Sequence, residues 1–114
     1  MNKLEKGMYV RTNLGIGRIV ELGKTGAGIG RNQGTSYYLS LENISKASHN
    51  IIDLIEIGDY VNSRRVNEVG AIQDLYTNKH TAISVEGSET LLTNNDIKEA
   101  LTKEQYKSQV FRVD

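Results

Sequence analysis

Glycines and basic side chains gather in one short stretch of the sequence, GKTGAGIGRNQG, which spans residues 23 to 34. Lys24 and Arg31 supply positive charge there, and Asn32 adds an amide that donates and accepts hydrogen bonds. Successive backbone amides beside glycine can form a concave nest that binds anions. Two tyrosines follow at positions 37 and 38, and one of them could stack on a base. The stretch therefore favours an anionic ligand of the nucleotide type.

The fragment GKTG also resembles part of a phosphate-binding Walker A loop, but its surroundings differ. Such a loop needs a glycine separated from Gly-Lys by four residues and a helix directly after it. Arg18 occupies that glycine position, with Ile19 next to it, and the segment SYYLSL that follows alternates as a strand does. The stretch is therefore interpreted as a hairpin with a glycine-rich tip of about twelve residues, well above the usual loop length. A plain loop without a ligand explains the same glycines and stays open.

Two further arginines, Arg11 and Arg18, fall on adjacent strands of the predicted sheet. Solvated surface positions explain them as well as ligand contacts do. The residues predicted to contact a ligand share positive charge, an amide or an aromatic ring, and they are Arg11, Arg18, Lys24, Arg31, Asn32 and Tyr38.

Catalytic and metal-binding patterns are missing from the sequence. The chain has no cysteine, which removes disulfides, thiolate zinc sites and cysteine nucleophiles. His49 and His80 lack neighbours at metal-ligand spacing, and no order typical of a serine hydrolase accompanies them. We therefore expect neither an enzyme nor a cofactor.

The net charge is zero, which argues against a dedicated nonspecific nucleic-acid binder. The charge is unevenly spread: residues 1–35 carry a net +4 and the remainder a net −4. Opposite charges on the two parts favour binding of an anion at one end or head-to-tail association of copies. The sequence has neither an apolar run of membrane-spanning length nor the apolar core of a signal peptide, so a cytoplasmic location is expected.

Segments of the chain repeat one another in the same order. The matching pairs are GMYVRTN (7–13) with GDYVNSR (58–64), LGIGRIVEL (14–22) with NEVGAIQDL (67–75), and YLSLEN (38–43) with AISVEG (82–87).

This alignment pairs Gly17 with Gly70, where a glycine inside a strand pattern predicts a bulge or bend. It also makes the gap between the first and the second matching segment two residues longer in the second copy. The repeat predicts two small β units, residues 1–55 with the glycine-rich tip and residues 56–114.

The last part of the chain departs from the strand pattern. NNDIKEALTKEQYKS, residues 94–108, predicts a short helix capped by Asn94 or Asn95, or else two short turns, the second capped at Thr102. QVFRVD at the end predicts a closing strand.

KGMYVRTNLGIGRIVEL followed by SYYLSL resembles the Tudor/SH3-like barrel of CarD-type RNA polymerase-interacting domains. This resemblance implies two tandem SH3-like barrels or half-barrels, and polymerase contacts made along a strand edge. The second half, with NIIDLIEIGDYVN and DIKEALTKEQYKSQVFRVD, resembles small proteins of unknown function encoded by phages and prophages of low-GC Gram-positive bacteria.

Two hypotheses of function follow. The first is a phage-encoded, non-catalytic binding protein that acts in the host cytoplasm against a host defence or regulatory system. It would bind a host protein or sequester a nucleotide-type signal, and it is expected to form a homo-oligomer. The alternative is an adaptor that associates with RNA polymerase or nucleic acid.

Overall fold

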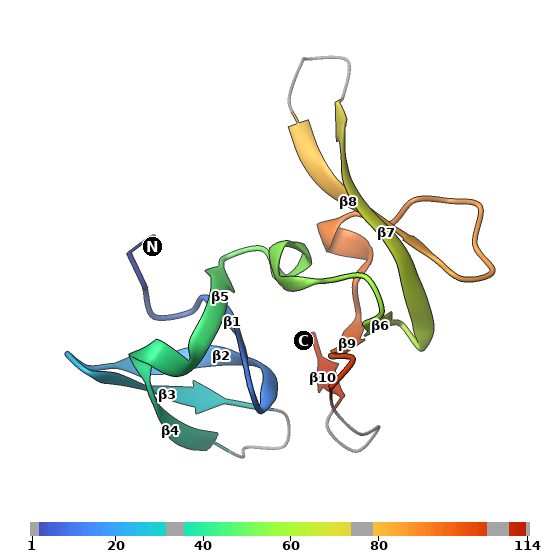
Figure 1. The fold of residues 1–114 in the computed structure, drawn as a ribbon. Helices are drawn as coiled ribbons and strands as arrows, with labels where there is room; N and C mark the ends of the chain where they lie inside the picture. Colours follow the sequence, from blue (N-terminus) through green and yellow to red (C-terminus); the bar gives the residue numbers. More distant parts are fainter. Residues whose placement is uncertain (1–2, 32–35, 74–78, 105–109, 114) are drawn as a thin grey trace.

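The computed structural model describes residues 3–31, 36–73, 79–104 and 110–113, and it is built mainly of β-strands (Figure 1). In chain order the strands are β1 (Tyr9–Thr12), β2 (Gly15–Leu22), β3 (Gly26–Gly30), β4 (Ser36–Ser40), β5 (Ile44–Ser48), β6 (Tyr60–Val61), β7 (Arg64–Gln73), β8 (Lys79–Val85), β9 (Glu99–Leu101) and β10 (Phe111–Arg112). Single turns of 3₁₀ helix connect some of them: η2 (Leu41–Asn43), η3 (Ile51–Leu54) and η4 (Asn94–Asp96). The prediction of a mainly β chain is confirmed. Within the described ranges, no helix has the length and apolar content to cross a membrane.

The strands form two antiparallel five-stranded sheets that share one connectivity. The first sheet has the order β4-β3-β2-β1-β5, and the second has the order β10-β9-β6-β7-β8. Strands β6, β7, β8 and β9 thus correspond to β1, β2, β3 and β5, with β10 added outside β9. A single bridge between Ile83 and Leu92 stands where β4 pairs with β3 in the first sheet. In Figure 1 the β7–β8 hairpin extends away from the rest of the molecule.

The correspondence extends to the register of the strands. Both second strands carry a bulge at the same place, between Ile19 and Glu21 in β2 and between Val66 and Glu68 in β7. Val66 therefore occupies the place of Ile19, and Gly70 corresponds to Gly23.

The sequence alignment that pairs Gly17 with Gly70 is wrong in this respect, as is the gap that it places in the second copy. Asn62 and Ser63 both have positive φ and close a tight two-residue hairpin between β6 and β7. The hairpin is therefore shorter in the second copy, although both loops have two residues, since four residues fewer separate Tyr60 from its partner Arg65 than separate Tyr9 from Arg18. By the same register YLSLEN corresponds to residues 91–96, and AISVEG is not its counterpart.

The long glycine-rich tip is also corrected, because half of it is a strand. The turn is confined to residues 23–25, where the Gly23 amide donates to the Gly26 carbonyl at 2.9 Å, and β3 follows at once. Ala27 and Ile29 are fully buried and alternate with the glycines of β3. Burial of these two side chains makes GAGIG a strand with one apolar face and one bare glycine face.

The predicted helix over residues 94–108 is not formed in the part that the structure describes. The Thr93 hydroxyl and the Asp96 carboxylate form a capping box around η4, so the cap is Thr93 and not Asn94 or Asn95. The chain then turns into β9, with Ile97 buried and Ala100 paired with Val61. Tertiary pairing therefore overrides the local helix preference. The end of the predicted closing strand is present as β10, and residues 105–109 lie outside the described ranges.

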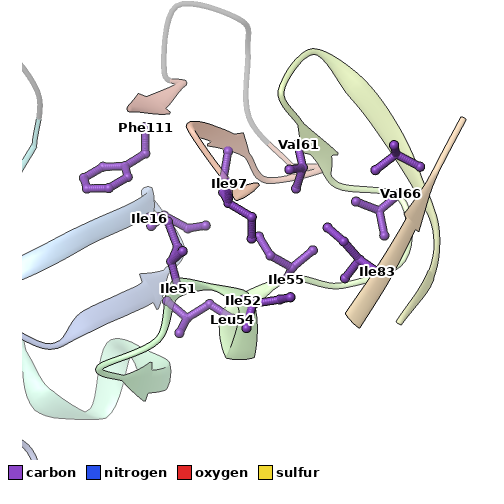
Figure 2. Close-up of a cluster of buried hydrophobic side chains, with 12 residues drawn as sticks. Ile16, Ile51, Ile52, Leu54, Ile55, Val61, Val66, Ile83, Ile97 and Phe111 are labelled. Carbon is purple, nitrogen blue, oxygen red and sulfur yellow. The ribbon is translucent and has the colours of Figure 1, made fainter. Parts of the chain in front are cut away.

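Two apolar clusters fill the molecule. One lies under one face of the first sheet and consists of Met8, Val10, Ile19, Ala27, Ile29 and Ile44. The larger one joins the two sheets (Figure 2), with Ile16 and Phe111 at the end toward the first sheet and Val66 and Ile83 in the second. The Tyr9 and Phe111 rings meet edge to face with centroids 6.0 Å apart. The side of the first sheet away from its own cluster thus rests partly on the second.

Candidate functional site

The first sheet has an outer face opposite its own apolar cluster. Strand alternation places on it, from one edge to the other, Lys46 and Ser48 of β5, Tyr9 and Arg11 of β1, Ile16 and Arg18 of β2, the three glycines of β3, and Ser36, Tyr38 and Ser40 of β4. The part around Tyr9, Arg11 and Ile16 is covered by the second sheet. The rest, from β2 to β4, stays open and is called the open platform below.

Tyr38 lies at the centre of β4 and is 66% exposed. A side-chain carbon added to Gly26 would stand 2.9 Å from Tyr38 Cζ, and one added to Gly23 would stand 2.9 Å from the Tyr38 hydroxyl oxygen. The Tyr38 ring therefore covers the backbone of Gly26 and reaches Gly23, and a side chain at either position would displace it. On the other flank Val20, 47% exposed, leans over Gly30 in the same way. On the open platform, Tyr38 and Val20 thus pack against the glycines of β3.

Arg18 borders the platform and is held in place. Its guanidinium carbon lies 5.0 Å from the centroid of the Tyr9 ring, and its Nε donates to the Gly7 carbonyl at 3.2 Å. Lys24 is exposed in the turn between β2 and β3, next to Gly23. The structure therefore places Arg18 and Tyr38 on the same face of the sheet, and Lys24 in the turn beside Gly23, which the Tyr38 hydroxyl adjoins.

Arg31 does not join them. Arg31 follows β3 on the core-facing alternation, and its Nη1 donates to the Leu14 carbonyl at 3.2 Å. Asn32 lies outside the described residues.

Arg11 differs most from its expected role. The sequence predicts it to be either a solvated surface residue or a ligand contact, but its side chain is buried. Its side chain is 4% exposed and forms a two-pronged ion pair with Asp59, with nitrogen–oxygen distances of 2.5 and 3.0 Å. The same guanidinium donates to the Leu54 carbonyl at 3.0 Å and to Glu104 at 3.1 Å. Burial lowers the pKa of Arg11, but the hydrogen bond and the charge of Asp59 outweigh burial and raise it overall. Arg11 is therefore a buried tie between the two sheets.

Asp59 is the centre of this tie and is completely buried. Besides Arg11 it accepts hydrogen bonds from the backbone amides of Glu56, at 2.7 Å, and Lys103, at 2.9 Å. Sequence reasoning missed this residue. Its signal is visible in the repeat, where G-D-Y-V stands against G-M-Y-V: Asp59 occupies the place of the buried Met8. A charge at a core position of a repeat requires a buried partner.

Glu56 extends the tie toward solvent. Its carboxylate lies 3.1 Å from both Lys46 Nζ and Lys103 Nζ and 3.6 Å from Arg11 Nη2. Burial raises the pKa of Glu56, but the hydrogen bonds from Lys103 and Lys46 and the charge of Arg11 together bring it below its ordinary value of 4.5.

The lowered pKa of Glu56 predicts how stability depends on pH. A carboxylate with a depressed pKa stabilises the fold above its unfolded-state pKa and loses that contribution as pH falls through the folded-state value. We expect Glu56→Gln to melt below the wild type at pH 7, and the difference to shrink steadily below pH 4.5. Thermal unfolding of both proteins from pH 7 to pH 3 measures this, and a pH-independent difference would contradict it.

Two hollows among the described residues lie away from the open platform. One of about 560 Å³ borders the tie and is lined by Arg11, Thr12, Asn13, Glu42, Asn43, Ser45, Glu56 and Glu104. Another, of about 510 Å³, lies beside η3 and η4 and is lined by Asn50, Ile52, Asp53, Lys79, His80, Thr81, Thr93, Asn94 and Asn95. Within the described ranges, no group of three or more His, Asp or Glu side chains is arranged to hold a metal ion.

Comparison of the chain with protein-family models, with curated proteins and with solved structures finds no match. The geometry of the site and the sequence therefore carry the functional argument.

Proposed function

We propose that this protein is a non-catalytic binding protein that docks a partner protein on the open platform of its first sheet. The observation that supports this most is Tyr38. Large aromatic side chains that are exposed yet held by the backbone beneath them dominate protein interfaces, because little conformational freedom is lost when they are covered. Val20 widens the apolar surface, and Arg18 and Lys24 add positive charge at its border.

A partner protein suits this surface better than a nucleotide-type signal. Small-molecule sites are concave and enclose most of their ligand, whereas the platform is a smooth strand face. Arg11, one of the cations expected to contact such a signal, is engaged by Asp59 instead.

The fold supports the same proposal at a finer level. A five-stranded antiparallel sheet with a single 3₁₀ turn before its last strand is the arrangement expected of a small SH3-like barrel, and the first sheet has this order. The second sheet has four of the five corresponding strands, with a single bridge in place of β4 and with β10 added outside β9. Two such barrels in tandem, a host protein as the partner and the cytoplasm of a Gram-positive host as the location remain parts of the proposal. The resemblance to CarD-type domains makes RNA polymerase the alternative partner.

The test uses a matched pair of variants. Leu91 is the counterpart of Tyr38 in the second sheet. Ile83 corresponds to Ala27, and Ile83 pairs with Leu92 as Ala27 pairs with Leu39, so the residues before them, Leu91 and Tyr38, also correspond. Leu91 is 48% exposed, so neither Tyr38→Ala nor Leu91→Ala removes a core side chain. Immobilised wild type is expected to retain a protein from a lysate of a low-GC Gram-positive bacterium, and mass spectrometry identifies it.

Tyr38→Ala is expected to weaken binding of that protein at least about tenfold, the usual effect of losing an interface aromatic. Leu91→Ala is expected to bind as the wild type does. Equal binding by both variants would show that the platform is not the interface. Retention of RNA polymerase would select the adaptor alternative. Stoichiometric binding of a nucleotide, measured by native mass spectrometry, would make a small molecule the ligand in place of a protein.

A further inference from the structure

Strand β4 is an open edge of the first sheet. It pairs with β3 along its whole length, and no other described strand pairs with it. The Leu41 amide donates to the Thr25 carbonyl at 3.0 Å. Hydrogen-bonded pairs alternate along an antiparallel ladder, so the pairs Leu39–Ala27 and Tyr37–Ile29 also exchange hydrogen bonds. Ser36 and Tyr38, which lie between these pairs, therefore direct their backbone N–H and C=O groups away from β3, toward the open edge. Ser40 directs its N–H there too, whereas its C=O, as that of the N-cap of η2, accepts the first hydrogen bond of this turn.

The β4 strand itself lacks three features that usually keep edge strands from pairing. Such strands commonly carry a charge, a proline or a bulge. SYYLS has neither a charged residue nor a proline, and its register with β3 runs without a shift. By contrast, the opposite edge strand β5 carries Lys46, and η3 packs beside it. The open edge of β4 is therefore prepared to accept another strand.

The sequence of β4 is complementary to itself in the antiparallel direction. When two copies pair about Tyr38, Ser36 stands opposite the second copy's Ser40, and Tyr38 stands opposite its own counterpart. The central pair of Tyr38 residues can exchange two hydrogen bonds, and in each outer pair the Ser40 N–H can donate to the Ser36 C=O of the other copy. A twofold axis through the centre of β4 forms these bonds in both copies at once.

The side chains fit the same register. On the core side Tyr37 stands opposite the second copy's Leu39, and both are only partly buried within one copy. Pairing covers their exposed parts with apolar surface. On the outer face the two Tyr38 residues stand opposite one another, and each ring lies over Gly26 of its own β3, so the rings leave room for the second strand. No like charges meet anywhere along the strand.

We propose that the protein forms a twofold dimer by antiparallel pairing of β4 with β4 of a second copy, which joins the two first sheets into one. The dimer does not depend on the proposed partner protein. It places the two open platforms side by side on one continuous sheet.

Ser40→Pro tests the pairing and leaves the monomer intact. Ser40 has φ −64°, which is the angle that proline imposes, and its N–H points to the open edge. The substitution therefore removes hydrogen bonds between copies without breaking a bond to β3. In sedimentation equilibrium we expect a dimeric wild type, and Ser40→Pro with a dimer dissociation constant raised at least about tenfold. Circular dichroism and the melting temperature at a concentration where the wild type is monomeric should match.

A charge exchange at the centre of the strand provides the second test. Tyr38→Lys and Tyr38→Glu each place like charges opposite one another, so each alone is expected to be monomeric. Their equimolar mixture pairs opposite charges and is expected to dimerise. A wild type that is monomeric up to millimolar concentration overturns the proposal, as does a dimer that Ser40→Pro and Tyr38→Lys leave unchanged. Either result leaves the comparison of Tyr38→Ala with Leu91→Ala intact as a test of partner binding.

Discussion

Replacement of Asp59 by alanine is expected to destabilise the protein by about 3–5 kcal/mol, the usual cost of leaving a buried charge without its partner. Arg11 would keep its charge in a nearly water-free position, because its side chain is only 4% exposed. The amides of Glu56 and Lys103 would also lose their acceptor. Urea denaturation followed by circular dichroism measures the change in the free energy of unfolding.

Two further variants separate the buried charge from its surroundings. Glu104 contacts the same guanidinium but is 56% exposed, so Glu104→Gln should cost about 1 kcal/mol or less. The double variant Arg11→Met/Asp59→Asn removes both charges and keeps an acceptor for the two amides. It should lose less stability than Asp59→Ala alone. A loss below about 1 kcal/mol for Asp59→Ala would mean that the buried ion pair between Arg11 and Asp59 is not formed in solution.

Phe111→Ala is expected to cost about 3–5 kcal/mol, because it opens a cavity where the two sheets meet. Phe111 is 5% exposed and packs edge to face against Tyr9, within the cluster that also contains Ile16. The same denaturation experiment applies. Phe111→Leu should lose less, since most of the apolar volume stays, and the exposed Leu91→Ala should change stability by about 0.5 kcal/mol or less. Equal effects of Phe111→Ala and Leu91→Ala would contradict the packing of β10 against the first sheet.

Sequence reasoning succeeds here where the evidence is local. Tyr9-Val10 and Tyr60-Val61 begin strands as β-branched and aromatic residues favour. The alternation of SYYLS gives β4 correctly. The strand GAGIG could have been found in the same way, because Ala27 and Ile29 stand two apart between glycines.

The errors concern positions that distant residues decide. Residues 99–101 form a strand because β6 pairs with them across almost forty residues, and local helix preference gives no sign of that. Arg11 resembles a surface cation until Asp59, forty-eight residues away, is placed beside it. The resemblance to a known barrel predicted neither contact. The first lies within the second sheet, and the second belongs to the junction between the sheets.

The tie between Arg11 and Asp59 has a consequence for synthesis on the ribosome. The chain leaves the ribosome from its N-terminus, so Arg11 emerges well before Asp59, and Ile16 emerges long before Phe111 covers it. Until then the first half carries a hydrated guanidinium and an uncovered apolar strip. The nascent chain therefore completes this junction only after Phe111 has emerged, and in that interval the uncharged β4 edge is open to pairing with other chains.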